Sequence, residues 1–119
     1  MNAQAIFNKV CRHLKKQNKH SKDPISKHCV YRSSNGYKCA IGCLIKDKEY
    51  NPSMELNGIT TLILDDKLAP ASLRKRLGPH IDLLEWLQCV HDNNAVDFWE
   101  YYLDMVAKHF GLKFDWNKI

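Results

Sequence analysis

Hydrophobic residues recur every three to four positions in three stretches of the chain, which is the spacing of one face of an α-helix. The first stretch runs from Ala3 to about Gln17, with Asn2 placed to cap it and with basic residues on the opposite face. The other two run over Ile81–His91 and from about Ala95 to Phe110, where a glycine ends the pattern. The pattern predicts three amphipathic helices that together form the body of the fold.

The last of these helices has two apolar stripes. One stripe has the spacing of a core-facing side and consists of Trp99, Tyr102, Leu103, Val106 and Phe110. The second stripe lies beside it and consists of Phe98, Tyr101 and Met105. Together they cover roughly 200° of the helix, whereas a surface helix needs about 100°. This helix is therefore either central in the bundle or partly covered by another chain. In the 81–91 helix the residues expected to share the core face are Leu83, Leu84, Trp86, Leu87 and Val90.

The middle of the chain contains shorter elements. The dipeptide Asn35-Gly36 is typical of a tight hairpin turn, and the segments Cys29–Tyr31 and Tyr37–Cys39 flank it, so a short β-hairpin is predicted. The segment Cys39–Ile45 could continue the second strand or begin a helix, and its small residues favour a short helix that packs closely on a neighbour.

Three more short segments follow. Asn51-Pro52 has the form of a cap and first residue of a one- or two-turn helix, and Pro70 opens another over Ala71–Leu77. The segment Ile59–Leu64 is compatible with helix or strand.

These elements predict a mainly α-helical fold with a minor β contribution: a compact helical domain with one short β-hairpin. The chain of 119 residues fits one globular domain over residues 1–119, with residues 112–119 as a candidate loose tail and a radius of gyration of about 13–14 Å. The chain has no run of about 18 apolar residues, which a membrane-spanning helix would need. The N-terminus also lacks the apolar stretch of a secretion signal. We expect a cytoplasmic protein with reduced cysteines.

Charge is divided unevenly along the chain. Residues 1–50 carry 11 Lys/Arg and three Asp/Glu, whereas residues 51–119 carry seven and ten. A basic half of this kind is either a solvated face or a surface for an acidic partner. Nucleic acid is not the expected partner, because the basic face has no interleaved aromatic residues and no recognisable reading element.

Three of the five cysteines lie close together in the sequence, and three interpretations are open. The favoured one is that they are inert core residues. A structural zinc site would use Cys29, Cys39, Cys43 and His91, or His28, although no Cys-x-x-Cys pair exists. A cysteine nucleophile would be Cys39 or Cys43 assisted by His91. We expect no cofactor, with zinc as the alternative.

The residues Tyr31, Arg32 and Tyr37 support another alternative, a protein that sequesters a small molecule such as a nucleotide. Aromatic rings and a guanidinium could together hold a base and a phosphate.

A sequence of motifs runs through most of the chain. Cys-x-Tyr-Arg at 29–32 is followed by Cys-Ala-Ile-Gly-Cys-Leu-Ile at 39–45, Met-Glu at 54–55 and Val-His-Asp at 90–92. In this order the chain resembles a group of small, mostly uncharacterised proteins encoded by tailed bacteriophages and prophages. The resemblance implies a phage accessory protein in the bacterial cytoplasm, of the kind that modulates a host enzyme or counters a defence system.

We therefore expect the chain to act by binding, with a host protein as the partner and homo-oligomerisation as an alternative. The residues expected to make the contact are Lys9, Arg12, Lys16, Phe98, Tyr101, Met105 and Trp116.

Overall fold

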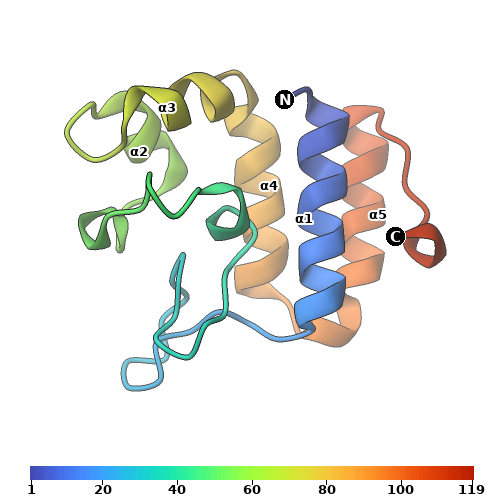
Figure 1. Ribbon diagram of the computed structural model, residues 1–119. Coiled ribbons are helices and arrows are strands. Elements are labelled where there is room, and N and C mark those ends of the chain that lie inside the picture. The colour runs from blue at the N-terminus through green and yellow to red at the C-terminus, as the bar shows by residue number, and fades with distance from the viewer.

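Three amphipathic helices form the main body of the molecule in the computed structural model, which describes residues 1–119 (Figure 1). They are α1 (Ala3–Gln17), α4 (Ile81–Asn93) and α5 (Trp99–Phe110). Two short helices, α2 (Ile59–Leu64) and α3 (Ala71–Leu77), lie at one side of this body (Figure 1). The mainly helical fold class is confirmed, and Ile59–Leu64, left open by its sequence, is helical.

Helix α1 begins and ends as its sequence predicts. The side chain of Asn2 accepts a hydrogen bond from the Ala5 N–H at 2.8 Å, and Asn18 ends the helix in the left-handed conformation with φ 53°. Its apolar stripe is fully buried: Ile6, Phe7, Val10, Cys11 and Leu14.

Helices α4 and α5 form an antiparallel pair joined by five residues that include the 3₁₀-helix η4 (Val96–Phe98). The residues that face the core from this pair are Leu83, Leu84, Leu87, Val90, Trp99, Leu103 and Val106. Trp86 does not join them, because its side chain is 41 % exposed and stacks on His109 at a ring distance of 4.1 Å.

The prediction of a β-hairpin is wrong, because its two strands do not form. The turn at Asn35-Gly36 forms, but the two arms share a single antiparallel bridge, between Arg32 and Lys38, and no strand develops. The reason is that the donor and the acceptor of the next ladder hydrogen bond are used elsewhere. In a longer ladder the Tyr31 N–H would donate to the Cys39 carbonyl, but it donates to Glu55 at 2.9 Å, and that carbonyl accepts from the Cys43 N–H at 3.1 Å. The N–H groups of Arg32 and Lys38 face away from the partner arm and donate to Glu55 and Gln17.

The segment Cys39–Ile45 is a helical turn, as predicted, and contains the 3₁₀-helix η1 (Gly42–Leu44). Its position depends on a close approach: a Cβ added to Gly42 would lie 2.0 Å from the carbonyl oxygen of Tyr31. Only glycine permits this contact.

A further short element, η2 (Pro52–Met54), starts at the predicted cap, where Asn51 accepts from the Ser53 N–H at 2.9 Å. Further along the chain, α3 continues through η3 (Gly78–His80) directly into α4. A buried ion pair ties this part together: Arg76 of α3 reaches Glu49 at 2.7 Å.

The C-terminal segment is held against α1. Gly111, with φ 65°, ends α5, and the chain turns back into residues 112–119, which include η5 (Trp116–Lys118). The ring of Phe114 packs edge-on against Phe7 at 5.6 Å, and Lys15 donates to the Trp116 carbonyl at 2.6 Å. The C-terminal segment therefore contacts α1 through both ring packing and a hydrogen bond.

One hydrophobic core connects all these elements, and the Cα radius of gyration is 13.6 Å, in the expected range. None of the helices is both long enough and apolar enough to cross a membrane.

Candidate functional site

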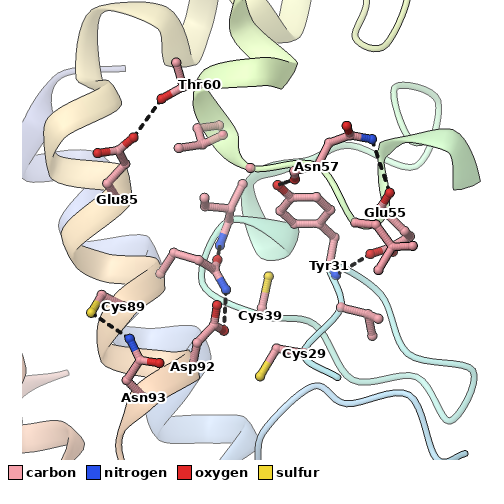
Figure 2. Close-up of a pocket in the computed structure, with 16 residues that line it drawn as sticks. Cys29, Tyr31, Cys39, Glu55, Asn57, Thr60, Glu85, Cys89, Asp92 and Asn93 are labelled. Carbon is pink, nitrogen blue, oxygen red and sulfur yellow. Dashed lines mark hydrogen bonds between the residues drawn. The ribbon is translucent and has the colours of Figure 1, made fainter. Parts of the chain in front are cut away.

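The largest cavity brings together much of the chemistry that the sequence singles out. It has a volume of about 600 Å³ and lies between α4, the segments around Tyr31 and Cys39, and the loop before α2 (Figure 2). Three carboxylates and three thiols line it: Glu55, Glu85, Asp92, Cys29, Cys39 and Cys89. None of the 16 lining residues is Lys, Arg or His. Such a cavity repels anions, which disfavours a nucleotide phosphate in it.

Most polar groups in the cavity already have partners within the chain. Both oxygens of Glu55 are used, by the backbone N–H groups of Tyr31 and Arg32 and by the Tyr50 hydroxyl. The Gln88 amide accepts from the N–H of residue 41 and donates to Asp92 at 2.7 Å. The Glu55 contacts join the segment around Tyr31 to residues 50–55, and the Gln88 contact with residue 41 joins the segment around Cys39 to α4, so these groups hold parts of the fold together.

The three residues expected to hold a small molecule do not converge. The Tyr31 hydroxyl donates to the Asn57 carbonyl, and burial raises the pKa of this phenol. The Arg32 guanidinium donates to the Ile45 carbonyl at 2.9 Å, pairs with Asp47 and lies over the Tyr50 ring. Tyr37 contacts Lys19 on a different part of the surface, with the ammonium 5.8 Å from the ring centre.

The two candidate nucleophiles are protected. Burial raises the pKa of the Cys39 thiol, which is 1 % exposed and accepts from the Gly42 N–H. Burial also raises the pKa of Cys43 to about 12, and its thiol donates to the Ala40 carbonyl at 3.0 Å. Catalytic cysteines need a lowered pKa and access to substrate, so this arrangement favours core thiols.

His91, the expected helper of either thiol, is fully buried and is used at both ring nitrogens. Its Nε2 accepts a hydrogen bond from the Ser21 N–H at 2.9 Å, so the ring proton is on Nδ1 and is donated to Asp92 at 2.7 Å. The hydrogen bonds therefore assign a neutral imidazole that ties the loop after α1 to α4.

A metal-binding geometry is partly present. Possible ligand atoms of Cys29, His91 and Asp92 lie within 4.8 Å of one another, whereas Cys39 and Cys43 of the predicted zinc set are not in this group. Burial and the Asp92 carboxylate raise the pKa of Cys29 to about 11, and the proton on His91 occupies the nitrogen that faces the group. Zinc binding at this group would have to release the Cys29 proton and break the hydrogen bond from His91 Nδ1 to Asp92.

A second hollow is apolar and lies on the outer side of the α4–α5 pair. It is a groove of about 470 Å³, and no residue of α1 lines it. Its apolar walls are Trp86, Val90, Tyr102, Met105 and Val106, joined by Cys89. The predicted second stripe of α5 continues from it, with Phe98 58 %, Tyr101 63 % and Met105 45 % exposed. We call the groove and this stripe together the α4–α5 face.

The remaining predicted contact residues lie elsewhere. Lys9, Arg12 and Lys16 are exposed on α1, away from the groove. Trp116 is half-buried, and the Lys15 ammonium lies over its ring at 5.3 Å. Trp86, which its spacing assigns to the core face, is 41 % exposed, so its place in the groove differs from the prediction. Tyr102 is partly buried against the core, in line with its place in the core-facing stripe, and also lines the groove.

Comparisons of the chain with protein-family models, with curated protein sequences and with solved structures find no match. The function is therefore argued from the surface and the site alone.

Proposed function

We propose that this protein acts by binding another protein through the α4–α5 face, and that it catalyses no reaction of its own. The observation that carries the proposal is the exposure of large apolar side chains in and beside a groove: Trp86 and Met105 line it, and Phe98 and Tyr101 are exposed on the stripe that includes Met105. Large aromatic residues and methionine are the side chains enriched in protein interfaces. An exposed apolar patch with this composition is typical of a binding site.

The alternatives receive less support from the geometry. Catalysis by Cys39 or Cys43 would require thiols that are exposed and easily ionised, and burial does the opposite. Sequestration of a nucleotide would require cations near the main cavity, which is lined by carboxylates.

The resemblance to proteins of tailed bacteriophages makes a bacterial host protein in the cytoplasm the expected partner. In this proposal the chain is an accessory protein that modulates a host enzyme or a defence system by occupying part of its surface.

Site-specific photo-cross-linking in bacterial cells tests the proposal. A benzoylphenylalanine introduced at Tyr101 should give one main adduct with a cellular protein, identified by mass spectrometry. The matched control is the same residue at Leu64, which is exposed and apolar but lies on α2. Equal adducts at both positions, or none at Tyr101, would contradict the proposal.

A further inference from the structure

The pair of helices that carries the α4–α5 face has the opposite charge to the rest of the molecule. Residues 81–110 contain six Asp/Glu and one Lys, a net charge of −5. All other residues together contain 17 Lys/Arg and seven Asp/Glu, a net charge of +10. An apolar groove therefore lies within a locally acidic surface of a basic protein.

The acidic side chains lie along both edges of the apolar patch. On α4, Asp82 and Glu85 are exposed four and one residues before Trp86, and Glu85 lines the groove itself. Asp104 is three residues after Tyr101 on α5, which places it beside Tyr101 on the helix, and the exposed Asp97 lies in η4, which directly precedes α5.

The single lysine of this helix pair does not cancel the acidic character of the surface. Lys108 is paired with Asp104 at 2.9 Å, so its charge is already matched. His109 is occupied by stacking on Trp86. The carboxylate of Glu85 accepts one hydrogen bond, from the Thr60 hydroxyl at 2.7 Å, and has no cation as a partner.

The shape of the groove favours a helix as its occupant. It runs between two antiparallel helices whose other side is covered by α1 (Figure 1). A helix laid along such a groove can insert its side-chain ridges between those of the pair.

We propose that the α4–α5 face binds a basic amphipathic helix of the partner protein. The apolar stripe of that helix packs on Trp86, Tyr102 and Met105, and its lysine or arginine side chains face Glu85 and Asp97. This inference rests on the proposed function and adds the chemistry of the partner to it. Charge complementarity supports the choice, because acidic edges attract basic residues and repel acidic ones.

A second copy of the chain fits the groove poorly. Two α4–α5 faces placed together would bring acidic edges against each other. The basic helix α1 of another copy offers only its polar side, with Lys9, Arg12 and Lys16, because its apolar stripe is buried in its own core.

Two fluorescein-labelled peptides of 18 residues test the inference on the full-length protein. One peptide consists of leucine and lysine, with the leucines spaced to form one face of a helix. The other has the same leucines, and every lysine is replaced by glutamate. Fluorescence anisotropy should show binding of the Leu/Lys peptide and none of the Leu/Glu peptide. The net charge of +5 on the whole protein works against general attraction of a cationic peptide, so binding requires the local acidic surface.

Matched variants separate the groove from simple charge. Met105→Glu should weaken binding of the Leu/Lys peptide about tenfold or more, although it adds negative charge, because a central apolar contact is lost. Leu64→Glu, which makes the same change on α2, should leave binding unchanged. Glu85→Lys should weaken binding about five- to tenfold, whereas Asp66→Lys, with the same charge change on an exposed loop, should have less than about a twofold effect.

Three results would overturn the inference. They are equal or stronger binding of the Leu/Glu peptide, failure of the Leu/Lys peptide to bind, and equal effects of the matched variants. A dimer in sedimentation that Met105→Glu dissociates would also overturn it, because the face would then bind a second copy. Cross-linking at Tyr101 does not depend on the charge of the partner, so the proposed function can stand when this inference fails.

Discussion

Residues 29–57 and the α4–α5 face use polar and apolar side chains in opposite ways. The first region contains the residue types with the greatest chemical reactivity, and nearly all of them are engaged inside the fold: Glu55 holds two backbone N–H groups, and Cys39 is buried. The second region consists of aromatic and acidic residues, and its large side chains remain exposed.

The difference shows that reactive residue types are no guide to function until their partners are known. The Cys-Ala-Ile-Gly-Cys segment looks like a site in the sequence, yet both of its thiols are engaged within the segment, by the Gly42 N–H and the Ala40 carbonyl. The less conspicuous stripe of α5 has no such internal role. Changes in the first region should therefore act on stability, and changes in the second on binding.

The largest effect is expected from Gly42→Ala. The added methyl group would lie 2.0 Å from the Tyr31 carbonyl oxygen, so the backbone has to move, at a cost of about 3 kcal/mol or more. Urea denaturation measures this loss. The control is Gly58→Ala, where nothing lies within 4 Å; because Gly58 caps α2 and Ala is a poorer N-cap, its cost should be about 1 kcal/mol or less. Equal stabilities of the two variants would show that residues 29–57 are not closely packed.

A loss of about 2–3 kcal/mol is expected from Glu49→Gln, because the half-buried Arg76 guanidinium loses its anionic partner. The control Asp104→Asn breaks an exposed pair with Lys108 and should cost about 0.5 kcal/mol or less.

The same pair gives a pH dependence. Hydrogen bonds from Arg76 lower the pKa of Glu49 to about 2. The stabilisation is therefore complete above about pH 4.5, the ordinary value of a Glu side chain, and is lost as the pH falls towards 2. The stability difference between the native chain and Glu49→Gln, measured from pH 7 to pH 2, should shrink over that interval; a constant difference would contradict the ion pair.

A moderate effect is expected from Cys39→Ala, at about 1–2 kcal/mol, because the thiol fills a buried site. Cys89→Ala, at an exposed position, should change stability by less than about 0.5 kcal/mol. Alkylation by iodoacetamide at neutral pH should modify Cys89 first and Cys39 only after unfolding. Rapid alkylation of Cys39 in the folded protein would instead favour the nucleophile interpretation.

The smallest effect on stability is expected from Tyr101→Ser, within about 0.5 kcal/mol, because the side chain is 63 % exposed. Thermal unfolding should change little, whereas the Leu/Lys peptide should bind more weakly. A large loss of stability would show that the second stripe of α5 belongs to the folded core and not to a contact surface.

The sequence predicts the elements whose stability is local. The capping residue Asn2 and the regular apolar spacing predict helix α1, and α5 ends at its glycine as expected. The β-hairpin does not extend because Glu55, 24 residues away in the sequence, accepts from the Tyr31 N–H that a longer ladder would need. No local pattern contains that information.

The sequence likewise predicts only part of the candidate site. The exposed stripe of Phe98, Tyr101 and Met105 follows from helical spacing within one element. The contact of His91 with Ser21 and the placement of Trp86 depend on how separate elements pack, so spacing along the chain could not reveal them.

The contact between His91 and Ser21 has a consequence for the order of folding. It joins residues 70 positions apart, whereas α4 and α5 are connected by five residues. Closing the long loop costs more chain entropy, so we expect the α4–α5 pair to form in the folding transition state and the loops to dock afterwards. In stopped-flow experiments Leu103→Ala should then slow refolding, and Tyr31→Phe should mainly speed unfolding; the reverse pattern would contradict this order. On this account the loops around the cysteines govern how long the folded molecule persists, and the helices that carry the binding surface govern how quickly it appears.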